Sequence, residues 1–259
     1  MLVESMSASG WVFAGIAALL IGLSKAGFGI GGGLVAVPMM ALALPTDFVL
    51  GVMLPLLIAG DVFANWHHLG HQSWRHLRPL LIGALIGVVL GTLLLIALQL
   101  RDRATFDAAL DLTVGGVCLA FVVIQVYRLL GGHVPHLPAH PLAGAAAGCL
   151  AATVSTLTHS AGMIVSLYLL ERRLEKTALT ATLVTYFLLI NLAKLPTYLW
   201  RELITPQTLV VTGCVALLVP VGTLIGVWLH RRIAQKPFVA TLYLLAALAA
   251  ARMIYRSLG

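Results

Sequence analysis

The sequence predicts an all-α polytopic membrane protein. Of its 259 residues, 60% are hydrophobic and only 10% are charged, and the mean hydropathy is +1.01. Residues 5–24, 26–46, 80–98 and 207–229 form uncharged windows of 20, 21, 19 and 23 residues. Each window could cross a hydrocarbon core of about 30 Å, because a helix rises about 1.5 Å per residue. This composition excludes an ordinary soluble domain.

Apolar segments follow one another in the same order in two halves of the chain. We expect them near residues 11–23, 34–44, 48–66, 79–99 and 106–130, and again near 142–157, 160–171, 178–199, 207–230 and 237–256. The stretch between them, GGHVPHLPAHP at 131–141, has the Gly and Pro content of a linker. The predicted organisation is therefore a first membrane repeat over 1–130 and a second over 142–259, each of about 120 residues, as in many transporters.

The loop charges predict how the two repeats are oriented. Because five segments per repeat is an odd number, the second repeat should be inverted relative to the first. Lys and Arg counted in alternate loops give ten residues on one side and five on the other. The positive-inside rule makes the ten-charge side cytoplasmic and places both termini outside. The amino-terminal MLVESMSASG has no basic region before its apolar stretch, so we expect a retained first helix. The expected location is a bacterial inner membrane.

A glycine run predicts a break in the first pair of segments. Five of the seven residues from Gly27 to Gly33 are glycine, and each costs about 1 kcal/mol relative to Ala in a helix. The G-x-G-x-x-G spacing within the run does not indicate a nucleotide site, because no strand precedes it. The following segment, 34–44, spans only about 16 Å, so its start should lie near the midplane and expose amides suited to an anion. Close helix packing is the alternative explanation of the glycines.

The second repeat is predicted to contain a similar break between two apolar segments, formed by different side chains. An offset of 129 superposes AGIAALLIGLSKAGFGIGGG on AGAAAGCLAATVSTLTHSAG, so STLTHSAG at 155–162 replaces the glycine run. Each repeat should then begin with a broken or re-entrant helix pair, which gives eight to ten membrane segments in all. We assign the other intramembrane glycines to helix packing, namely Gly83, Gly87, Gly91, Gly222 and Gly226. We expect the three cysteines, Cys118, Cys149 and Cys214, to be buried.

Polar side chains inside two apolar segments predict a functional site. Asp61 and Asn65 are four residues apart, and Asn191, Lys194 and Tyr198 are three and then four apart, so each set shares a helix face. Ionisable groups at such depth indicate function by default. The offset of 129 carries Asn65 onto Lys194, which suggests that one cavity receives both. Two structural alternatives stand beside this: Lys194 could snorkel to the interface, and Asp61 could pair with a buried base.

The sequence resembles the TauE/SafE family of sulfite and organosulfonate transporters. The resemblance rests on GLSKAGFGIGGGLVAVPMMALALP, LPLLIAGDVFANW and THSAGMIVSLYLLERRLEKTALTATLVTYFLLINLAKLPTY. It departs from the family where Ser160, Met163, Ile164 and Ala181 replace the usual residues. It implies a transporter of small sulfur-containing anions, and it implies functional roles for Gly31, Gly32, Gly33, Asp61, His159, Gly162, Thr182, Asn191, Lys194 and Tyr198.

The combined hypothesis is a secondary transporter working by alternating access. The glycine amides, Asn65 and the loop with His159 and Ser160 would bind the anion, Lys194 would supply positive charge, and Asp61 would be the coupling group. The expected partners are a small anion and the lipid bilayer, without nucleic acid, cofactor or metal, and the sequence allows a homo-oligomer.

Two other functions compete with this hypothesis. A transition-metal or other cation transporter could use the loop histidines, which are His67, His68, His71, His76, His133, His136 and His140. An intramembrane hydrolase could use Ser155 and His159, which are four residues apart, although no oxyanion motif accompanies them.

Overall fold

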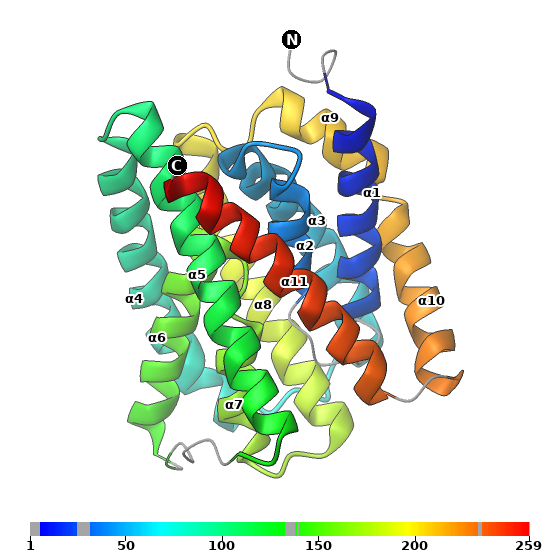
Figure 1. The fold of residues 1–259 in the computed structure, drawn as a ribbon. Helices are drawn as coiled ribbons and strands as arrows, with labels where there is room; N and C mark the ends of the chain where they lie inside the picture. The colour runs from blue at the N-terminus through cyan, green and yellow to red at the C-terminus, as the bar shows by residue number, and fades with distance from the viewer. Residues whose placement is uncertain (1–5, 25–31, 133–137, 139, 233–234, 259) are drawn as a thin grey trace.

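The computed structural model describes residues 6–24, 32–132, 138, 140–232 and 235–258. Within these ranges the chain folds into helices and contains no strand, which confirms the all-α prediction. The first half contains α1 (Ala8–Leu23), α2 (Gly32–Ala41), α3 (Thr46–His68), α4 (Trp74–Gln99) and α5 (Arg103–Leu129). The second half contains α6 (Pro141–Thr158), α7 (Gly162–Leu170), α8 (Lys176–Trp200), α9 (Pro206–Val215), α10 (Leu218–Arg232) and α11 (Gln235–Leu258) (Figure 1).

Polar caps fix where several of these helices begin. Asp102 accepts hydrogen bonds from the Thr105 hydroxyl and amide at the start of α5, and these bonds hold the pKa of the Asp102 carboxyl below its usual value. Thr205 and Thr208 form a reciprocal capping box ahead of α9, with Pro206 at the first helical position. Both caps lie in short connections between apolar segments, where the chain leaves the membrane.

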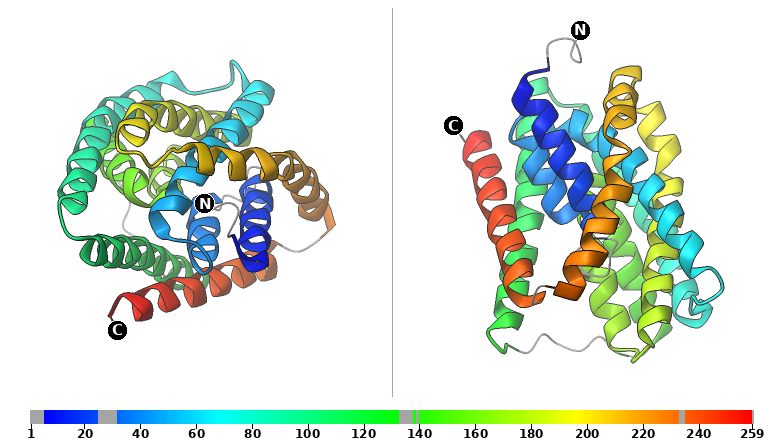
Figure 2. Two further views of the ribbon diagram at one scale, coloured as in Figure 1. Left: turned by 90° about the horizontal axis from the view of Figure 1, so that it is seen from above. Right: turned by 90° about the vertical axis from the view of Figure 1, so that its right-hand side faces the viewer.

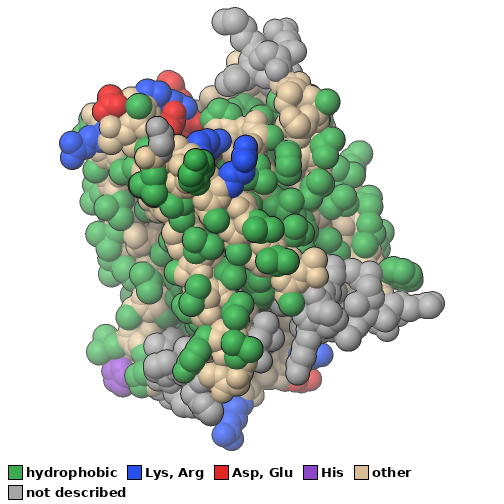
Figure 3. Space-filling model, viewed as in Figure 1, with side chains coloured by type: hydrophobic (Ala, Val, Ile, Leu, Met, Phe, Trp, Pro, Cys, Tyr) green, Lys and Arg blue, Asp and Glu red, His purple; other side chains and the backbone are tan. Residues whose placement is uncertain are grey.

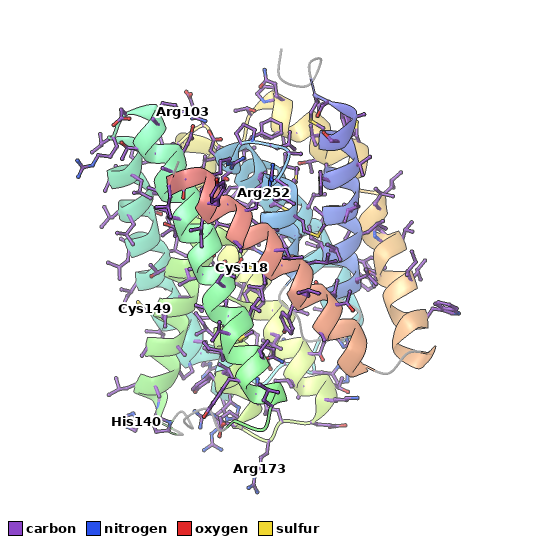
Figure 4. The ribbon with its side chains drawn as sticks, in the orientation of Figure 1. Arg103, Cys118, His140, Cys149, Arg173 and Arg252 are labelled. Carbon is purple, nitrogen blue, oxygen red and sulfur yellow. The ribbon has the colours of Figure 1, made fainter. Side chains whose placement is uncertain are left out.

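The long helices run between two opposite faces of the molecule, whereas the short helices end at breaks in its interior. We call the face with the start of α1 and the end of α11 the terminus end, and the face with the end of α5 and the start of α6 the linker end (Figure 1). α1 and α2 form a hairpin that begins and ends at the terminus end, since a side chain at Gly10 would touch Leu44. α6 and α7 form the matching hairpin at the linker end, where Arg172 Nη2 donates to Pro138 O at 2.6 Å. His140 and Arg173, which flank this hairpin, accordingly lie at the same face (Figure 4).

Fewer helices cross the whole molecule than the sequence suggested. Over the described ranges, five helices (α3, α4, α5, α6 and α8) are long and apolar enough to span a membrane, and the bent pair α9 and α10 makes a sixth if it counts as one span. The expected segment 207–230 is therefore present but broken, because α9 and α10 meet at an angle of 41°. Pro220 explains the bend, since its ring would clash with the carbonyl of Ala216, where α9 ends.

The outer surface is apolar in its middle and charged at its ends (Figure 3). Leu85 on α4 and Leu224 on α10 are 66% and 71% exposed, as expected of side chains that face lipid. Tryptophans are exposed near the helix ends, with Trp66, Trp74 and Trp228 toward the linker end and Trp200 at the terminus end. Such aromatic belts mark the two membrane interfaces.

Glycines permit two close helix pairings, as predicted. α4 lies against α6, and a Cβ at Gly83 or Gly87 would collide with the carbonyls of Ala145 and Cys149. α1 lies against α10, where a Cβ at Gly222 would collide with the Leu19 carbonyl (Figure 2). These contacts bring backbones together as small residues do in membrane helix pairs.

The prediction for the cysteines is correct only in part. Cys118 is buried and its thiol donates to Leu34 O at 3.3 Å and Ala246 O at 3.6 Å, whereas Cys149 is half-buried and Cys214 is exposed. Cys214 lies on the outer face of α9. Lipid surrounds an apolar side chain there, just as a protein core would.

Candidate functional site

The centre of the protein is formed by α3 and α8, which run antiparallel and carry most of the predicted polar residues (Figure 1). Asn191 Nδ2 on α8 donates to Asp61 Oδ2 on α3 at 2.8 Å, and both side chains are buried. A buried carboxylate needs such donors, because burial without them costs several kcal/mol. The two predicted polar segments therefore meet across the interface between the two halves of the chain.

Lys194 lies fully buried one turn further along α8. Its Nζ donates to Ser155 O at 3.2 Å and to Ser155 Oγ at 2.9 Å, and it lies 3.2 Å from His159 Nδ1. These three contacts match the three N–H donors of an ammonium group. Lys194 therefore does not snorkel to the interface, and its head group is held against the end of α6.

His159 forms the break between α6 and α7. It adopts the left-handed conformation with φ 53°, which ends α6, and its ring is buried. Its Nε2 lies 3.2 Å from Leu50 O, an acceptor, so the partners assign the proton to Nε2 and leave Nδ1 to accept from Lys194. Tyr198 OH donates to Thr156 O at 2.7 Å and lies 3.3 Å from the same Nε2.

The start of α2 meets this break from the other half of the chain. A Cβ at Gly33 would collide with the carbonyl of His159, so the two backbones are in direct contact. Gly32 is the first residue of α2, whereas Gly31 lies outside the described residues. Cys118 of α5 holds this first turn through its bond to Leu34 O. The two short helices predicted to flank a common site thus begin next to each other.

Other predicted site residues lie further toward the linker end. Asn65 Oδ1 accepts from Thr185 Oγ1 at 2.9 Å, one turn beyond Asp61. Thr182 Oγ1 on α8 accepts from the amide of Ser73, the residue just before α4, at 2.9 Å. The structure does not bring either residue to Lys194. Ser160, by contrast, is buried at the break, but its hydroxyl donates to Thr158 O at 2.9 Å. Gly162 is the first residue of α7.

Sequence reasoning missed some partners of Lys194. Ser155 was considered only as a hydrolase nucleophile, yet its hydroxyl and carbonyl both accept from Lys194. Its spacing of four residues from His159 places both on one face of the helix end, and that spacing was the available signal. The carbonyl of Leu50, which binds His159, has no signature in a sequence because any residue supplies a carbonyl.

The loop histidines that favoured cation transport have local partners. The His71 ring lies 3.2 Å from Leu69 O, and His76 Nδ1 lies 2.8 Å from Ser73 Oγ. Over the described ranges, no group of three His, Cys, Asp or Glu side chains could hold a metal ion. His133 and His136 lie outside the described residues.

Comparison with known proteins assigns the chain to a family. The family model described as "Sulfite exporter TauE/SafE" matches residues 14–253, nearly the whole chain. No curated protein and no solved structure matches the chain. The match covers both helix hairpins and the central pair α3 and α8. The chain therefore belongs to the TauE/SafE family of membrane transporters, which export sulfite and related sulfur-containing anions.

Proposed function

We propose that this protein is a secondary transporter that moves a small sulfur-containing anion, such as sulfite or a sulfonate, by alternating access. The observation that carries this proposal is the fully buried ammonium of Lys194 beside the break at His159. Burying a charge is costly, and intramembrane cations commonly mark substrate or ion pathways.

The partners of Lys194 suit an exchangeable site. Ser155 and the His159 ring are neutral acceptors, so an incoming anion can replace one of them and form a stronger, charge-assisted hydrogen bond. The backbone at the start of α2, beside Gly33, adds amide donors at a helix amino terminus. Asn191 and Tyr198 lie on the same face of α8 and complete the wall of this site.

Alternating access requires two parts that move against each other, and helix pairing supports two inverted repeats. α4 packs on α6 while α10 packs on α1, so the fourth element of each half lies against the first element of the other when the bent pair α9 and α10 counts as one element. The equivalent helices α3 and α8 pair with each other, as do α5 and α11. This reciprocal pattern fits repeats over 1–130 and 142–259, joined by a linker at 131–141 and related by an axis in the membrane plane.

The orientation in the membrane follows from the charges at the two ends. Residues at the helix ends and loops of the linker end include nine Lys or Arg, whereas the terminus end has five. The positive-inside rule then makes the linker end cytoplasmic and places both termini outside. In a bacterial inner membrane, export would move the anion from the linker end to the terminus end.

Asp61 is the proposed coupling group. It is fully buried, it bonds to Asn191, and its negative charge attracts Lys194. Asp61 comes from the first half of the chain and Lys194 from the second, so any relative movement of the halves alters their interaction. A carboxyl group so placed can take up or release a proton once per transport cycle.

Flux measurements in proteoliposomes test the proposal. Wild-type protein should move sulfite, and Lys194→Ala and Asn191→Ala should abolish or strongly reduce that flux. His71→Ala serves as the control, because its ring lies in a loop at the linker end and contacts only Leu69 O among its described partners. Unchanged flux in both Lys194→Ala and Asn191→Ala would contradict the proposed site. Metal-dependent flux lost in His71→Ala would favour cation transport, and peptide cleavage dependent on Ser155 would indicate a hydrolase.

A further inference from the structure

A pocket of about 350 Å³ opens at the terminus end, apart from the central residues. The first turn of α3 contributes Asp47 and Phe48 to its lining, and α5 contributes Arg103, which lies at this end of the molecule (Figure 4). The connection between α8 and α9 contributes Glu202 and Leu203. The pocket is therefore built from both halves of the chain, at the outer ends of the same two helices that carry Asp61 and Lys194.

The floor of this pocket is joined directly to the central network. The Leu203 amide donates to Tyr198 O at 3.0 Å, and the Tyr198 hydroxyl contacts His159. On the α3 side, a Cβ at Gly51 would collide with the carbonyl of Leu203, and Gly51 follows Leu50, whose carbonyl binds His159. The pocket and the His159 ring are thus separated by about one helical turn, or about 5 Å along the helix axis.

The charges that line the pocket disfavour an anion. Asp47 and Glu202 are acidic, and the only lining base described is Arg103, whose Nη2 lies 2.8 Å from Asp47 Oδ2. Arg103 also donates from Nε to Asp107 Oδ2 at 3.0 Å, so its positive charge is shared between two carboxylates. Glu202 is exposed at the rim and leaves the lining with an excess of negative charge.

The two ends of the protein differ in the same sense. Among the described residues, five basic and five acidic side chains belong to the terminus end, so their charges cancel. Of the side chains that the structure describes at the linker end, six are basic and only Glu171 and Glu175 are acidic. A cleft or face lined by one sign of charge concentrates ions of the opposite sign and excludes ions of its own sign. An anion is therefore concentrated at the linker end and is neither attracted to nor held in the pocket at the terminus end.

We infer that this pocket is the outer vestibule of the anion pathway, and that Asp47 and Glu202 oppose re-entry of the released anion from the terminus end. The inference rests on the proposed function, because it adds an exit and a directional preference to the same central site. The vestibule does not change the equilibrium of transport. It raises the anion concentration needed for half-saturation from the terminus end relative to that needed from the linker end.

Vesicles of either orientation provide the test, with the initial rate of [³⁵S]sulfite uptake as the readout. Glu202→Gln and Glu202→Lys form a charge series on an exposed side chain, so neither change alters the core. For uptake from the terminus end, the sulfite concentration needed for half-saturation should fall about two- to sixfold at each step of the series. This is the effect of a change of one unit of charge about 8 Å from a mono- or dianion in water. For uptake from the linker end, the concentration needed for half-saturation should not change. The difference should disappear near 1 M salt, where the Debye length is only about 3 Å.

Glu175→Gln is the matched control, because Glu175 is an exposed acid at the opposite end of α8. Glu175→Gln should lower the sulfite concentration needed for half-saturation only when sulfite enters from the linker end. If flux depends on Lys194 but the Glu202 series changes half-saturation equally from both ends, or from neither at low salt, the vestibule is overturned and the proposed function stands. If the wild type moves no sulfite, or Lys194→Ala leaves flux intact, the proposed function fails and the vestibule fails with it.

Discussion

Replacing Lys194 with methionine should separate stability from anion binding. Methionine keeps an unbranched apolar stem in the fully buried space and removes the ammonium group. Ser155 O still accepts the His159 amide at 3.0 Å, and the Ser155 hydroxyl can donate elsewhere, so the acceptor left without a donor is His159 Nδ1. An orphaned buried acceptor costs about 1–3 kcal/mol, whereas removing a buried charge recovers a desolvation penalty of several kcal/mol.

The substrate-free variant should therefore differ little in stability from the wild type, because the recovered desolvation penalty of Lys194 offsets both the orphaned acceptor and the lost attraction to Asp61. Anion binding should weaken about 10- to 150-fold, because a hydrogen bond to a charged group contributes about 1.5–3 kcal/mol. Thermal unfolding in detergent with and without sulfite measures both quantities, since a ligand stabilises only the protein that binds it. Unaltered sulfite stabilisation together with a strongly lowered unfolding temperature would refute the reasoning and make Lys194 a structural residue.

Asp61→Asn sharpens the same experiment. The charge of Asp61 attracts Lys194, so Lys194→Met leaves Asp61 without that attraction. The double variant should regain any stability lost in Lys194→Met, with a coupling energy of about 0.5–3 kcal/mol in the mutant cycle. It should not regain anion binding, because no positive charge returns to the site. Recovery of binding would show that the positive charge of Lys194 serves only to balance Asp61.

Three further predictions concern packing and hydrogen bonds. Gly83→Val should destabilise the pairing of α4 and α6 by about 1–3 kcal/mol in thermal unfolding, while Gly116→Ala, which meets no neighbour, should be neutral or stabilising. Tyr198→Phe should cost about 1–3 kcal/mol and reduce sulfite flux, because the buried Thr156 carbonyl loses its donor; unchanged stability would argue against that bond. Arg256→Ala should destabilise by a similar amount, since the buried Asp111 loses donors at 2.6 and 2.9 Å, and adding Asp111→Asn should restore part of the loss.

Segment positions could be predicted closely, because charge and proline punctuate the apolar stretches. The expected segments 48–66 and 178–199 correspond to α3 (Thr46–His68) and α8 (Lys176–Trp200). The bend between α9 and α10 was missed although Pro220 signalled it, because the apolar run continues through the bend without a polar residue. Periodicity and hydropathy indicate which side chains of a segment are apolar. They do not indicate whether the helix changes direction within that segment.

The composition of the site could be predicted in part, from residues that share a helix face and from the two breaks that meet. Asn191, Lys194 and Tyr198 lie on one face of α8, as their spacing required. The superposition of Asn65 on Lys194 predicted a shared cavity, but the proposed inverted repeats would place equivalent residues at equal depths on opposite sides of the midplane. Asn65 accordingly contacts Thr185 toward the linker end, while Lys194 contacts His159 toward the terminus end. Internal symmetry identifies equivalent positions, and equivalent positions need not be neighbours.

The chemistry of the centre is less symmetric than its helices, and in the proposed function this difference would link the anion to Asp61, the proposed coupling group. The first half contributes a glycine at the start of α2 and the carboxylate of Asp61, while the second contributes His159 and Lys194. An anion beside Lys194 competes with Asp61 for one positive charge, so binding at one group alters the free energy of the other. By the same reciprocity, neutralising Asp61 should strengthen the hold of Lys194 on the anion. A transporter needs this linkage if substrate and proton are to move in a fixed ratio.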